Sequence, residues 1–451
     1  MQHNNTNGNK VDNKEKKPSK QKKPIRKSFL ESDGFLFEQV LRDGKNLFAR
    51  YNISDSTVEY IESHVDKKGV WYVPQLGEEI EKGFIYLPSA AEEYTSQEKL
   101  GWDIRKFVRK WLEVSEEHLQ YIVWNILKSW VFDKFETVSY LRVIGDYGTG
   151  KTRYLKTVGY LHYKPIVTSG ATTSAPLFRV IDKWRGTPLI DEFDLRFSDE
   201  TVELIKIVNL GFEKGSGIMR CDTNNPNIIK FFDPYCPKVI ATRKPFEDKA
   251  TESRCFSTVL DGMTRTDIPA ELDSSFYEEA QLLRNKLLLW RFRMYNKIDV
   301  NAARNIDLGD IEPRLKQMNQ GFVALFANEK DTLTKFKEFL LKQNENIVSE
   351  RKSSMNGMII SAFCKLVFAE QQTFIAPGDI VREAELKDAK GDLLNPNRIA
   401  KNLKELGLDA RKVCYVHGKA KNCIIWNNAS LRRLAKRYGM TVKEPSNKDP
   451  F

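Results

Sequence analysis

Residues 140–152 contain the feature that most constrains this chain, an apolar run that leads into a glycine-rich turn. Leu141 to Ile144 precede the pattern Gly145-x-x-x-x-Gly150-Lys151-Thr152. The glycines allow successive backbone N–H groups to face one anion, and a following helix adds the positive end of its dipole. Lys151 can then reach the outer phosphates of a nucleotide, and the Thr152 hydroxyl can hold Mg²⁺. The pattern predicts that the chain binds a nucleoside triphosphate, most simply ATP. The predicted binding loop consists of Gly145, Asp146, Tyr147, Gly148, Thr149, Gly150, Lys151 and Thr152.

The length of 451 residues is enough for two or three domains, each with its own core. The six cysteines show no C-x-x-C spacing and the five histidines form no ligand pair, which argues against a zinc site or a disulfide framework. No apolar run approaches 18 residues, and the N-terminus lacks the apolar segment of a signal peptide. We therefore expect a cytoplasmic protein with no membrane partner, and a nuclear location is not excluded.

The formal charge of +11 is concentrated at the two ends of the chain. Residues 1–27 hold nine Lys/Arg against two Asp/Glu, and residues 351–440 hold seventeen against eight. Two basic ends indicate a polyanionic partner, most simply nucleic acid. The first 27 residues have almost nothing to bury, so we expect a disordered arm. That arm could tether nucleic acid or act as a nuclear import signal, or it could be only a solubilising tail.

Strand-like and helical patterns alternate between residues 138 and 260, as a parallel sheet with crossover helices requires. The fold class is therefore predicted to be α/β. The strands are expected at 140–144, 165–168, 187–190, 238–242 and 255–260. The expected domains are a disordered arm (1–27), a small mixed segment (28–95), an ATPase core with leading helices (96–265), a helical lid (266–348) and a basic C-terminal domain (349–451).

Two acids follow the strand at 187–190, and they extend nucleotide binding to a prediction of hydrolysis. At the mouth of a parallel sheet, Asp191 can hold Mg²⁺ and Glu192 can act as the general base toward water. Thr242, at the end of a later strand, could position the same water or could be a satisfied strand-end threonine.

Two arginines are candidate contacts to the phosphates. Arg254 precedes the last strand. It could supply positive charge to the γ-phosphate, in its own chain or in a neighbouring subunit's site, or it could pair with a nearby acid. Arg314 follows Pro313 at the predicted start of a lid helix and could sense the nucleotide.

Taken together, the motif order resembles the core of an AAA+ ATPase, with Walker A at 145–152, Walker B at 191–192, sensor 1 at Thr242, the arginine finger at Arg254 and sensor 2 at Arg314. The resemblance covers about 138–345 and implies a ring, usually a hexamer, in which Arg254 acts in trans. Residues 217–232 read as a β-hairpin before sensor 1, which is similar to the minichromosome-maintenance and superfamily 3 helicases of mobile elements. Its basic residues, Arg220 and Lys230, lie below an asparagine-rich tip.

The basic C-terminal domain resembles a winged helix. Asn395-Pro396 caps an amphipathic helix with Ile399, Leu403 and Leu406 on one face, and a hairpin follows at 411–426. This resemblance implies DNA contact by the helix and the wing, with a solvated charged face as the alternative. The predicted nucleic-acid contacts are Arg220, Lys230, Arg398, Lys401, Lys419, Lys421, Arg432 and Arg433.

Three functions remain as hypotheses. The first is an ATP- and Mg²⁺-dependent DNA helicase or translocase in replication, a homo-oligomer whose priming activity, if any, belongs to a primase partner. The second is an ATP-switched DNA-binding protein, such as a loader or a defence or transposition regulator, that never unwinds. The third, a small-molecule kinase, would leave Arg254, Arg314 and the basic domain without a role.

Overall fold

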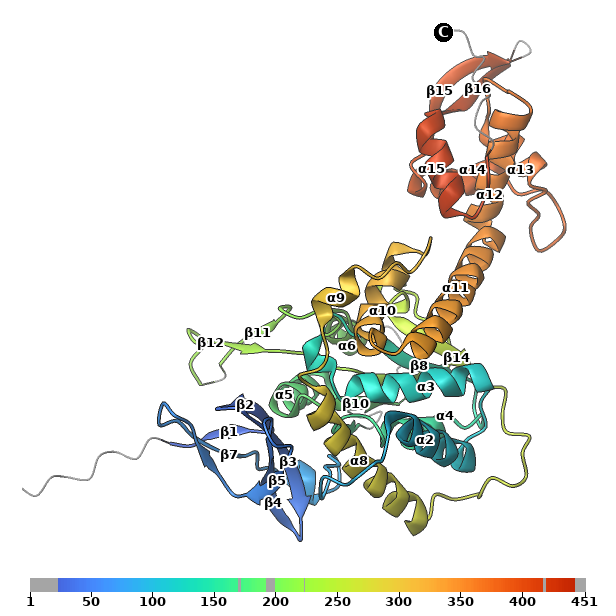
Figure 1. Ribbon diagram of the computed structural model, residues 1–451. Helices are drawn as coiled ribbons and strands as arrows, with labels where there is room; N and C mark the ends of the chain where they lie inside the picture. The colour runs from blue at the N-terminus through green and yellow to red at the C-terminus, as the bar shows by residue number, and fades with distance from the viewer. Residues whose placement is uncertain (1–22, 169–171, 192–198, 223, 417–418, 443–451) are drawn as a thin grey trace, which may run out of the picture. The chain divides into compact units, whose positions relative to one another are not determined.

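The computed structural model describes residues 23–168, 172–191, 199–222, 224–416 and 419–442 (Figure 1). The chain divides into two compact units. The first comprises Met1–Ile306 and Lys316–Asn328, and the second comprises Asp307–Leu315 and Glu329–Phe451. Within the described residues, no helix combines the length and the apolar character needed to cross a membrane.

A five-stranded parallel sheet forms the centre of the first unit, which confirms the predicted α/β fold. Its order is β14-β8-β13-β10-β9. The strands are β8 (Tyr140–Ile144), β9 (Pro165–Val167), β10 (Thr187–Ile190), β13 (Val239–Thr242) and β14 (Cys255–Val259). Every residue of β8, β10 and β13 is buried. Continuous burial of this kind is typical of a parallel sheet that is covered on both faces.

Helix α4 (Lys151–Gly159) packs against the central strands of this sheet. Its last residue, Gly159, lies so close to β10 that an added Cβ would sit 2.4 Å from a methyl carbon of Leu189. The other helices around the sheet are α2 (Gln97–Trp111), α3 (Glu116–Ser129), α5 (Ser174–Trp184), α6 (Asp199–Leu210) and the short α7 (Lys249–Glu252). Ser96 and Ser115 cap α2 and α3 by accepting hydrogen bonds from Lys99 N and His118 N.

Two β-sheets precede the core, and they differ in part from the expected mixed segment. The four-stranded sheet is antiparallel, in the order β2 (Phe29–Ser32), β3 (Phe35–Arg42), β4 (Lys45–Asn52) and β5 (Val58–Ile61). The three-stranded sheet contains β1 (Ile25–Lys27), β7 (Trp71–Pro74) and β6 (His64–Val65). The apolar pattern at residues 35–41 therefore lies in a strand.

One local expectation in this region was wrong. Residues 25–27, expected in the disordered arm, form β1 because they pair with 72–74 of β7. A long-range partner, absent from the local pattern, decided that outcome. The short helix α1 (Glu78–Glu81) follows β7, and the apolar run from Gly83 contributes a single bridge, between Ile85 and Ile166.

A buried ionic cluster joins the four-stranded sheet to the core. Glu38 of β3 accepts hydrogen bonds from the Tyr163 hydroxyl (2.7 Å) and from Arg291 Nε (2.6 Å), and it pairs with Lys164 at 2.9 Å. The same Arg291 guanidinium pairs with Asp133 at 2.7 Å. Burial would raise the pKa of Asp133, but Arg291 outweighs burial and holds that pKa below its usual value.

The expected helical lid is distributed between the two units. Helices α8 (Ser274–Met294) and α9 (Val300–Arg304) belong to the first unit, where α8 packs on α2. Helix α10 (Pro313–Phe326) has its first three residues in the second unit and the rest in the first. The predicted boundary at 349 falls inside α11 (Lys330–Ser353), which is continuous. A helical pattern does not reveal which body a helix packs against.

The second unit has one apolar core, built from helices and a hairpin. Its elements after α11 are α12 (Met355–Cys364), the π-helical turn η2 (Lys365–Ala369), α13 (Pro377–Glu383), α14 (Pro396–Glu405), β15 (Asp409–Val416), β16 (Lys419–Ile425) and α15 (Asn428–Arg437). Asn395 caps α14 by accepting from Asn397 N at 2.9 Å, and α14 buries Ile399 and Leu403. The predicted capped helix and the hairpin that follows it are therefore both present.

Candidate active site

The glycine-rich loop lies at the carboxyl end of β8 and leads directly into α4. Gly148 (φ 74°) and Gly150 (φ 95°) adopt backbone conformations that favour glycine, so the loop can turn sharply before the helix begins. The Lys151 ammonium, 9% exposed, donates to the carbonyl oxygens of Gly145 and Asp146, both at 2.8 Å. The lysine is therefore held inside the loop at the positive end of α4, where an anion is favoured.

The two predicted metal-binding side chains are in contact. Thr152, in the first turn of α4, donates its hydroxyl hydrogen to Asp191 Oδ2 at 2.9 Å. Asp191 directly follows β10, so two separate elements bring a hydroxyl and a carboxylate together at the carboxyl ends of the strands. Oxygen donors of this kind fit Mg²⁺, which commonly uses one or two protein ligands together with phosphates. The predicted general base, Glu192, lies outside the described residues.

Thr242 lies next to the loop because β13 runs between β8 and β10. The Thr242 carbonyl accepts a hydrogen bond from Gly145 N at 3.1 Å. Its hydroxyl is buried, at 1% exposure of the residue, and has no hydrogen-bond partner among the described residues. A buried hydroxyl without a partner is costly, so this atom has unused hydrogen-bonding capacity beside the loop.

Sequence reasoning missed Arg243, the residue that follows β13. Its guanidinium carbon lies 3.9 Å from the centre of the Tyr147 ring in the loop. Tyr147 itself is 72% exposed. The available signal was position alone, since Arg243 follows a residue that was already singled out.

Arg254 lies at the amino ends of the strands, whereas the loop lies at their carboxyl ends. Residue 255 of β14 is in register with residue 140, the first residue of β8, and Tyr140 N donates to Arg254 O at 2.9 Å. The loop begins only after β8 ends, and five extended residues span roughly 16 Å. Arg254 therefore does not reach the loop of its own chain. Its side chain is half-buried, donates to Ala250 O at 2.5 Å and lies over the Phe212 ring.

An ion pair between a buried arginine and a partly exposed glutamate, also missed from the sequence, fixes the short helix that precedes Arg254. Arg142 on β8 is 0% exposed and donates to both carboxylate oxygens of Glu252, the last residue of α7. Its Nε donates to Ser257 Oγ at 2.9 Å. The only signal in the sequence was a single charge within an apolar strand.

The other predicted nucleotide contact, Arg314, lies in the first turn of α10 and belongs to the second unit. The loop belongs to the first unit. A role for Arg314 at the phosphates stays a prediction.

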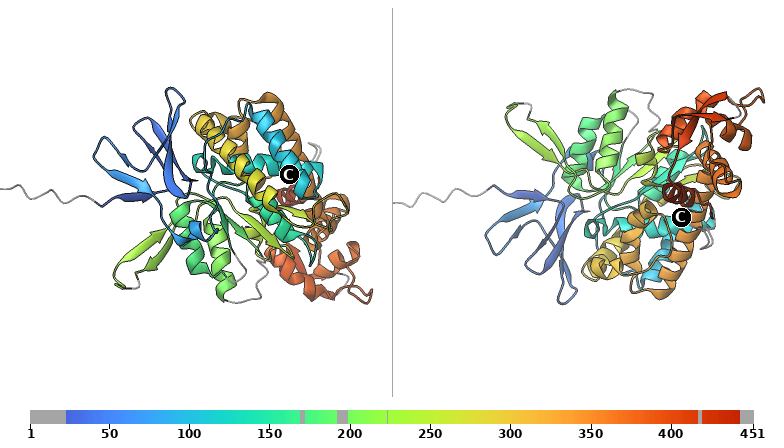
Figure 2. Two further views of the ribbon diagram at one scale, coloured as in Figure 1. Left: turned by 90° about the horizontal axis from the view of Figure 1, so that it is seen from below. Right: turned by 90° about the horizontal axis from the view of Figure 1, so that it is seen from above.

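The hairpin predicted before Thr242 is present as β11 (Ile218–Cys221) and β12 (Ile229–Phe232), and it projects beside α5 (Figure 2). Its two candidate nucleic-acid residues, Arg220 and Lys230, are directly opposite each other and pair with the carboxylates of Glu203 and Asp222. The hairpin also exposes four large apolar side chains, Met219, Ile228, Ile229 and Phe231.

The basic candidates of the second unit lie on two helices and a strand. Arg398 and Lys401 are exposed on α14. Arg432 on α15 lies over the Phe368 ring, and Arg433 donates to Ser430 Oγ at 3.2 Å. Lys419 and Lys421 belong to β16, and their side chains lie outside the described set.

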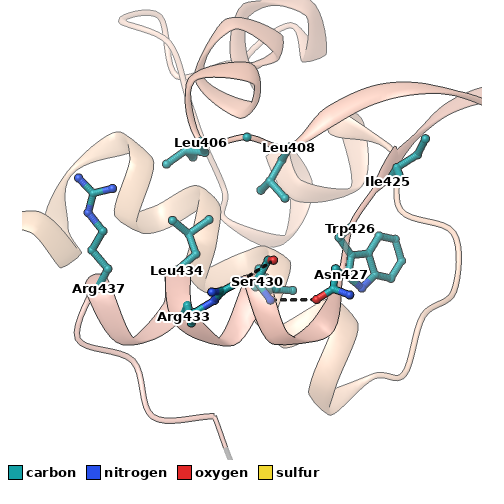
Figure 3. Close-up of a pocket in the computed structure, with 11 residues that line it drawn as sticks. Leu406, Leu408, Ile425, Trp426, Asn427, Ser430, Arg433, Leu434 and Arg437 are labelled. Atoms are coloured by element: carbon teal, nitrogen blue, oxygen red, sulfur yellow. Dashed lines mark hydrogen bonds between the residues drawn. The ribbon is translucent and has the colours of Figure 1, made fainter.

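Arg433 also borders a groove of about 560 Å³ between α15 and the turn from α14 to β15 (Figure 3). Leu406, Leu408 and Leu434 line it together with Trp426 and Arg437. The setting of Arg433 is therefore partly apolar.

Comparison with known proteins gives only weak similarities. No family model and no curated protein matches the sequence. Among solved structures, the chain is similar to the apo C-terminal region of NrS-1, with 10% identity and a TM-score of 0.40 over 87% of this chain and 97% of that one. It is also similar to a mutant of Thermotoga maritima RuvB (14% identity, TM-score 0.24, 73% of this chain and 97% of that one). A third similarity is to the Aeropyrum pernix ORC1 protein in complex with DNA (14% identity, TM-score 0.22, 74% and 96%). Similarities of this size assign no family.

Proposed function

We propose that this chain is an AAA+ ATPase that works as a ring oligomer, most simply a hexamer, and that moves along or unwinds DNA in replication. One observation carries the ATPase assignment. The Thr152 hydroxyl meets the Asp191 carboxylate at 2.9 Å, beside a glycine loop that holds the Lys151 ammonium. Binding of a triphosphate with Mg²⁺ needs these groups close together, as they are at the carboxyl ends of the strands.

Each of these residues then has its own role. Loop N–H groups and Lys151 bind the phosphates, while Thr152 and Asp191 hold Mg²⁺. The metal, when bound, neutralises charge that develops on the phosphate oxygens. Glu192, next to Asp191 in sequence, accepts a proton from the attacking water.

The requirement for an oligomer rests on Arg254. Its position at the amino ends of the strands keeps it away from phosphates bound at the loop of its own chain. An arginine that acts on a neighbour's γ-phosphate must lie away from the phosphates of its own chain, as Arg254 does, and Arg142 with Glu252 holds the short helix that precedes it. A site completed in this way requires at least two copies.

The DNA assignment rests on charge. Arg398 and Lys401 are exposed on a capped helix of a basic unit, where they can contact phosphates. We assign binding by the DNA backbone, with strong salt dependence. A primase, if required, is a separate partner.

A second candidate, an ATP-switched DNA-binding protein that does not unwind, is favoured by the hairpin. Its two basic residues are engaged by Glu203 and Asp222, so they offer less charge to grip a moving strand.

The test measures ATP turnover and displacement at a forked DNA for the wild type and for Lys151→Ala, Glu192→Gln and Arg254→Ala. We expect each variant to lose turnover, with a loss of about 10³-fold or more for Arg254→Ala. DNA-stimulated turnover without displacement in the wild type would favour the switch. Turnover proportional to an added acceptor, and independent of DNA, would instead identify a kinase.

A mixing experiment tests the shared site. Arg254→Ala retains an intact loop and Lys151→Ala retains an intact arginine, so mixed oligomers contain some complete sites. Recovery of turnover in the mixture supports action in trans. A mixture that stays inactive, although both variants assemble with wild-type chains, would contradict it.

A further inference from the structure

Arg243 follows the carboxyl end of β13, next to the proposed nucleotide-binding loop. It follows Thr242, whose carbonyl is hydrogen-bonded to Gly145 N at 3.1 Å, so the chain leaves β13 alongside the start of the loop. Because β13 lies between β8 and β10, Arg243 also lies between the loop, which follows β8, and Asp191, which follows β10. Arg254, by contrast, lies at the amino ends of the strands.

The Arg243 side chain reaches over the loop. Its guanidinium lies 3.9 Å from the centre of the Tyr147 ring, and Tyr147 is a loop residue between Asp146 and Gly148. A planar guanidinium stacks well on an aromatic face and binds phosphate oxygens with paired N–H donors. The Thr242 hydroxyl, one residue earlier, is 1% exposed and lies within the strand. Of these two neighbours, Arg243 is the one whose polar head reaches the loop.

We propose that Arg243 is a catalytic residue that contacts the γ-phosphate of ATP bound to its own chain. This inference rests on the proposed ATPase function and adds to it a second arginine, which acts in cis where Arg254 acts in trans. In hydrolysis, water bonds to the γ-phosphorus, the bond to the β–γ bridging oxygen breaks, and ADP leaves with that electron pair. Arg243 forms and breaks no covalent bond and stabilises the charge on the γ-phosphate oxygens. Tyr147 holds the guanidinium over the loop.

Mixed oligomers distinguish action in cis from action in trans. Arg243→Ala and Arg254→Ala damage different chains of one shared site, so their mixture contains complete sites and should regain turnover. Arg243→Ala and Lys151→Ala both damage the chain that holds the nucleotide, so that mixture should stay inactive. Recovery with Lys151→Ala would overturn the assignment in cis. If turnover also fails to recover in the mixture of Arg254→Ala with Lys151→Ala, the proposal that Arg254 acts in trans fails. The proposal for Arg243 is then decided by the single Arg243 variants.

The single variants are measured by turnover and by binding of fluorescent ATP and ADP. Arg243→Ala should lower kcat by about 100-fold, the usual effect of losing one such donor. It should weaken ATP binding more than ADP binding, because only ATP carries the γ-phosphate. Unchanged ADP affinity shows that the fold and the loop are intact. Arg243→Lys should recover part of the ATP preference and less of kcat, since it keeps the charge without the planar fork. Wild-type kcat, or an equal loss of ATP and ADP affinity, in Arg243→Ala would overturn the proposal.

Discussion

Individual residues at the carboxyl ends of the strands follow from the sequence to different degrees. The loop from Gly145 to Thr152 was identifiable because its chemistry is written in consecutive residues, and Asp191 because it ends an apolar strand. Arg142 and Arg243 were not identifiable, since their partners, Glu252 and Tyr147, are brought to them only by the folded sheet. Motifs report local geometry, and pairings between strands do not appear in them.

Two buried histidines make stability depend on pH. His118 Nε2 lies 2.7 Å from the Tyr154 hydroxyl, and His162 Nε2 lies 2.9 Å from Asn125 Oδ1. Burial lowers the pKa of His118 to about 3 and that of His162 to about 4, from an ordinary value of 6.5. The unfolded chain therefore binds more protons than the native one below about pH 6.5. This contribution to stability is complete above that pH and is lost as the pH falls toward 4.

We expect the free energy of unfolding, measured with urea, to fall by on the order of 1 kcal/mol per histidine for each pH unit below about 6.5. Measurement between pH 7 and 5.5 keeps most carboxylates ionised. His118→Phe, which retains an aromatic ring beside Phe256, should show a shallower dependence than the wild type. An identical dependence in that variant would contradict the assignment to His118.

At the scale of elements, the central strands were predictable and several edges were not. The strands at 140–144 and 187–190 were placed correctly because buried parallel strands read as short apolar runs bounded by turns. Strand β1 was missed because three residues at the end of a basic arm carry no such pattern and depend on β7.

The contact between α4 and β10 gives a matched pair of glycine substitutions. Gly159→Ala places a Cβ 2.4 Å from a buried Leu189 methyl, so we expect a loss of about 1–3 kcal/mol from overpacking. Gly101→Ala, in α2, meets only Val123 Cγ1 at 3.5 Å and should gain roughly 0.5–1 kcal/mol from helix propensity.

Thermal unfolding of the two variants beside the wild type measures both changes. Gly159→Ala should also bind nucleotide less tightly, because α4 carries Lys151 and Thr152. A stabilised Gly159→Ala would show that Leu189 moves aside without cost.

At the scale of the whole molecule, the two basic ends and the α/β centre were visible in composition, whereas the grouping of helices into units was not. Helix α8 joins the first unit because it packs on α2 and because Arg291 reaches Glu38. Periodicity identifies a helix and its apolar face, but the partner of that face is a tertiary property.

The buried cluster around Glu38 should make the N-terminal sheets and the core unfold together. Glu38→Gln leaves Lys164 and Arg291 buried with one carboxylate fewer, and we expect a loss of about 3–5 kcal/mol. Glu59→Gln, which breaks the partly exposed pair with Arg50 on the same sheet, should cost less than about 1 kcal/mol. Urea unfolding, followed by far-ultraviolet circular dichroism, compares the two. Equal small losses would show that the cluster does not couple the sheets to the core.

The placement of Arg254 bears on how copies would associate under the proposed function. If Arg254 completes a neighbour's site, each copy receives an arginine at the carboxyl ends of its strands and donates one from their amino ends, so copies that repeat one such contact join head to tail. Such a series has a direction, and unless it closes it leaves one unfinished site at one end and one unused Arg254 at the other. Specific activity should then rise steeply with protein concentration, and a small share of Arg254→Ala subunits should silence neighbours that are themselves intact.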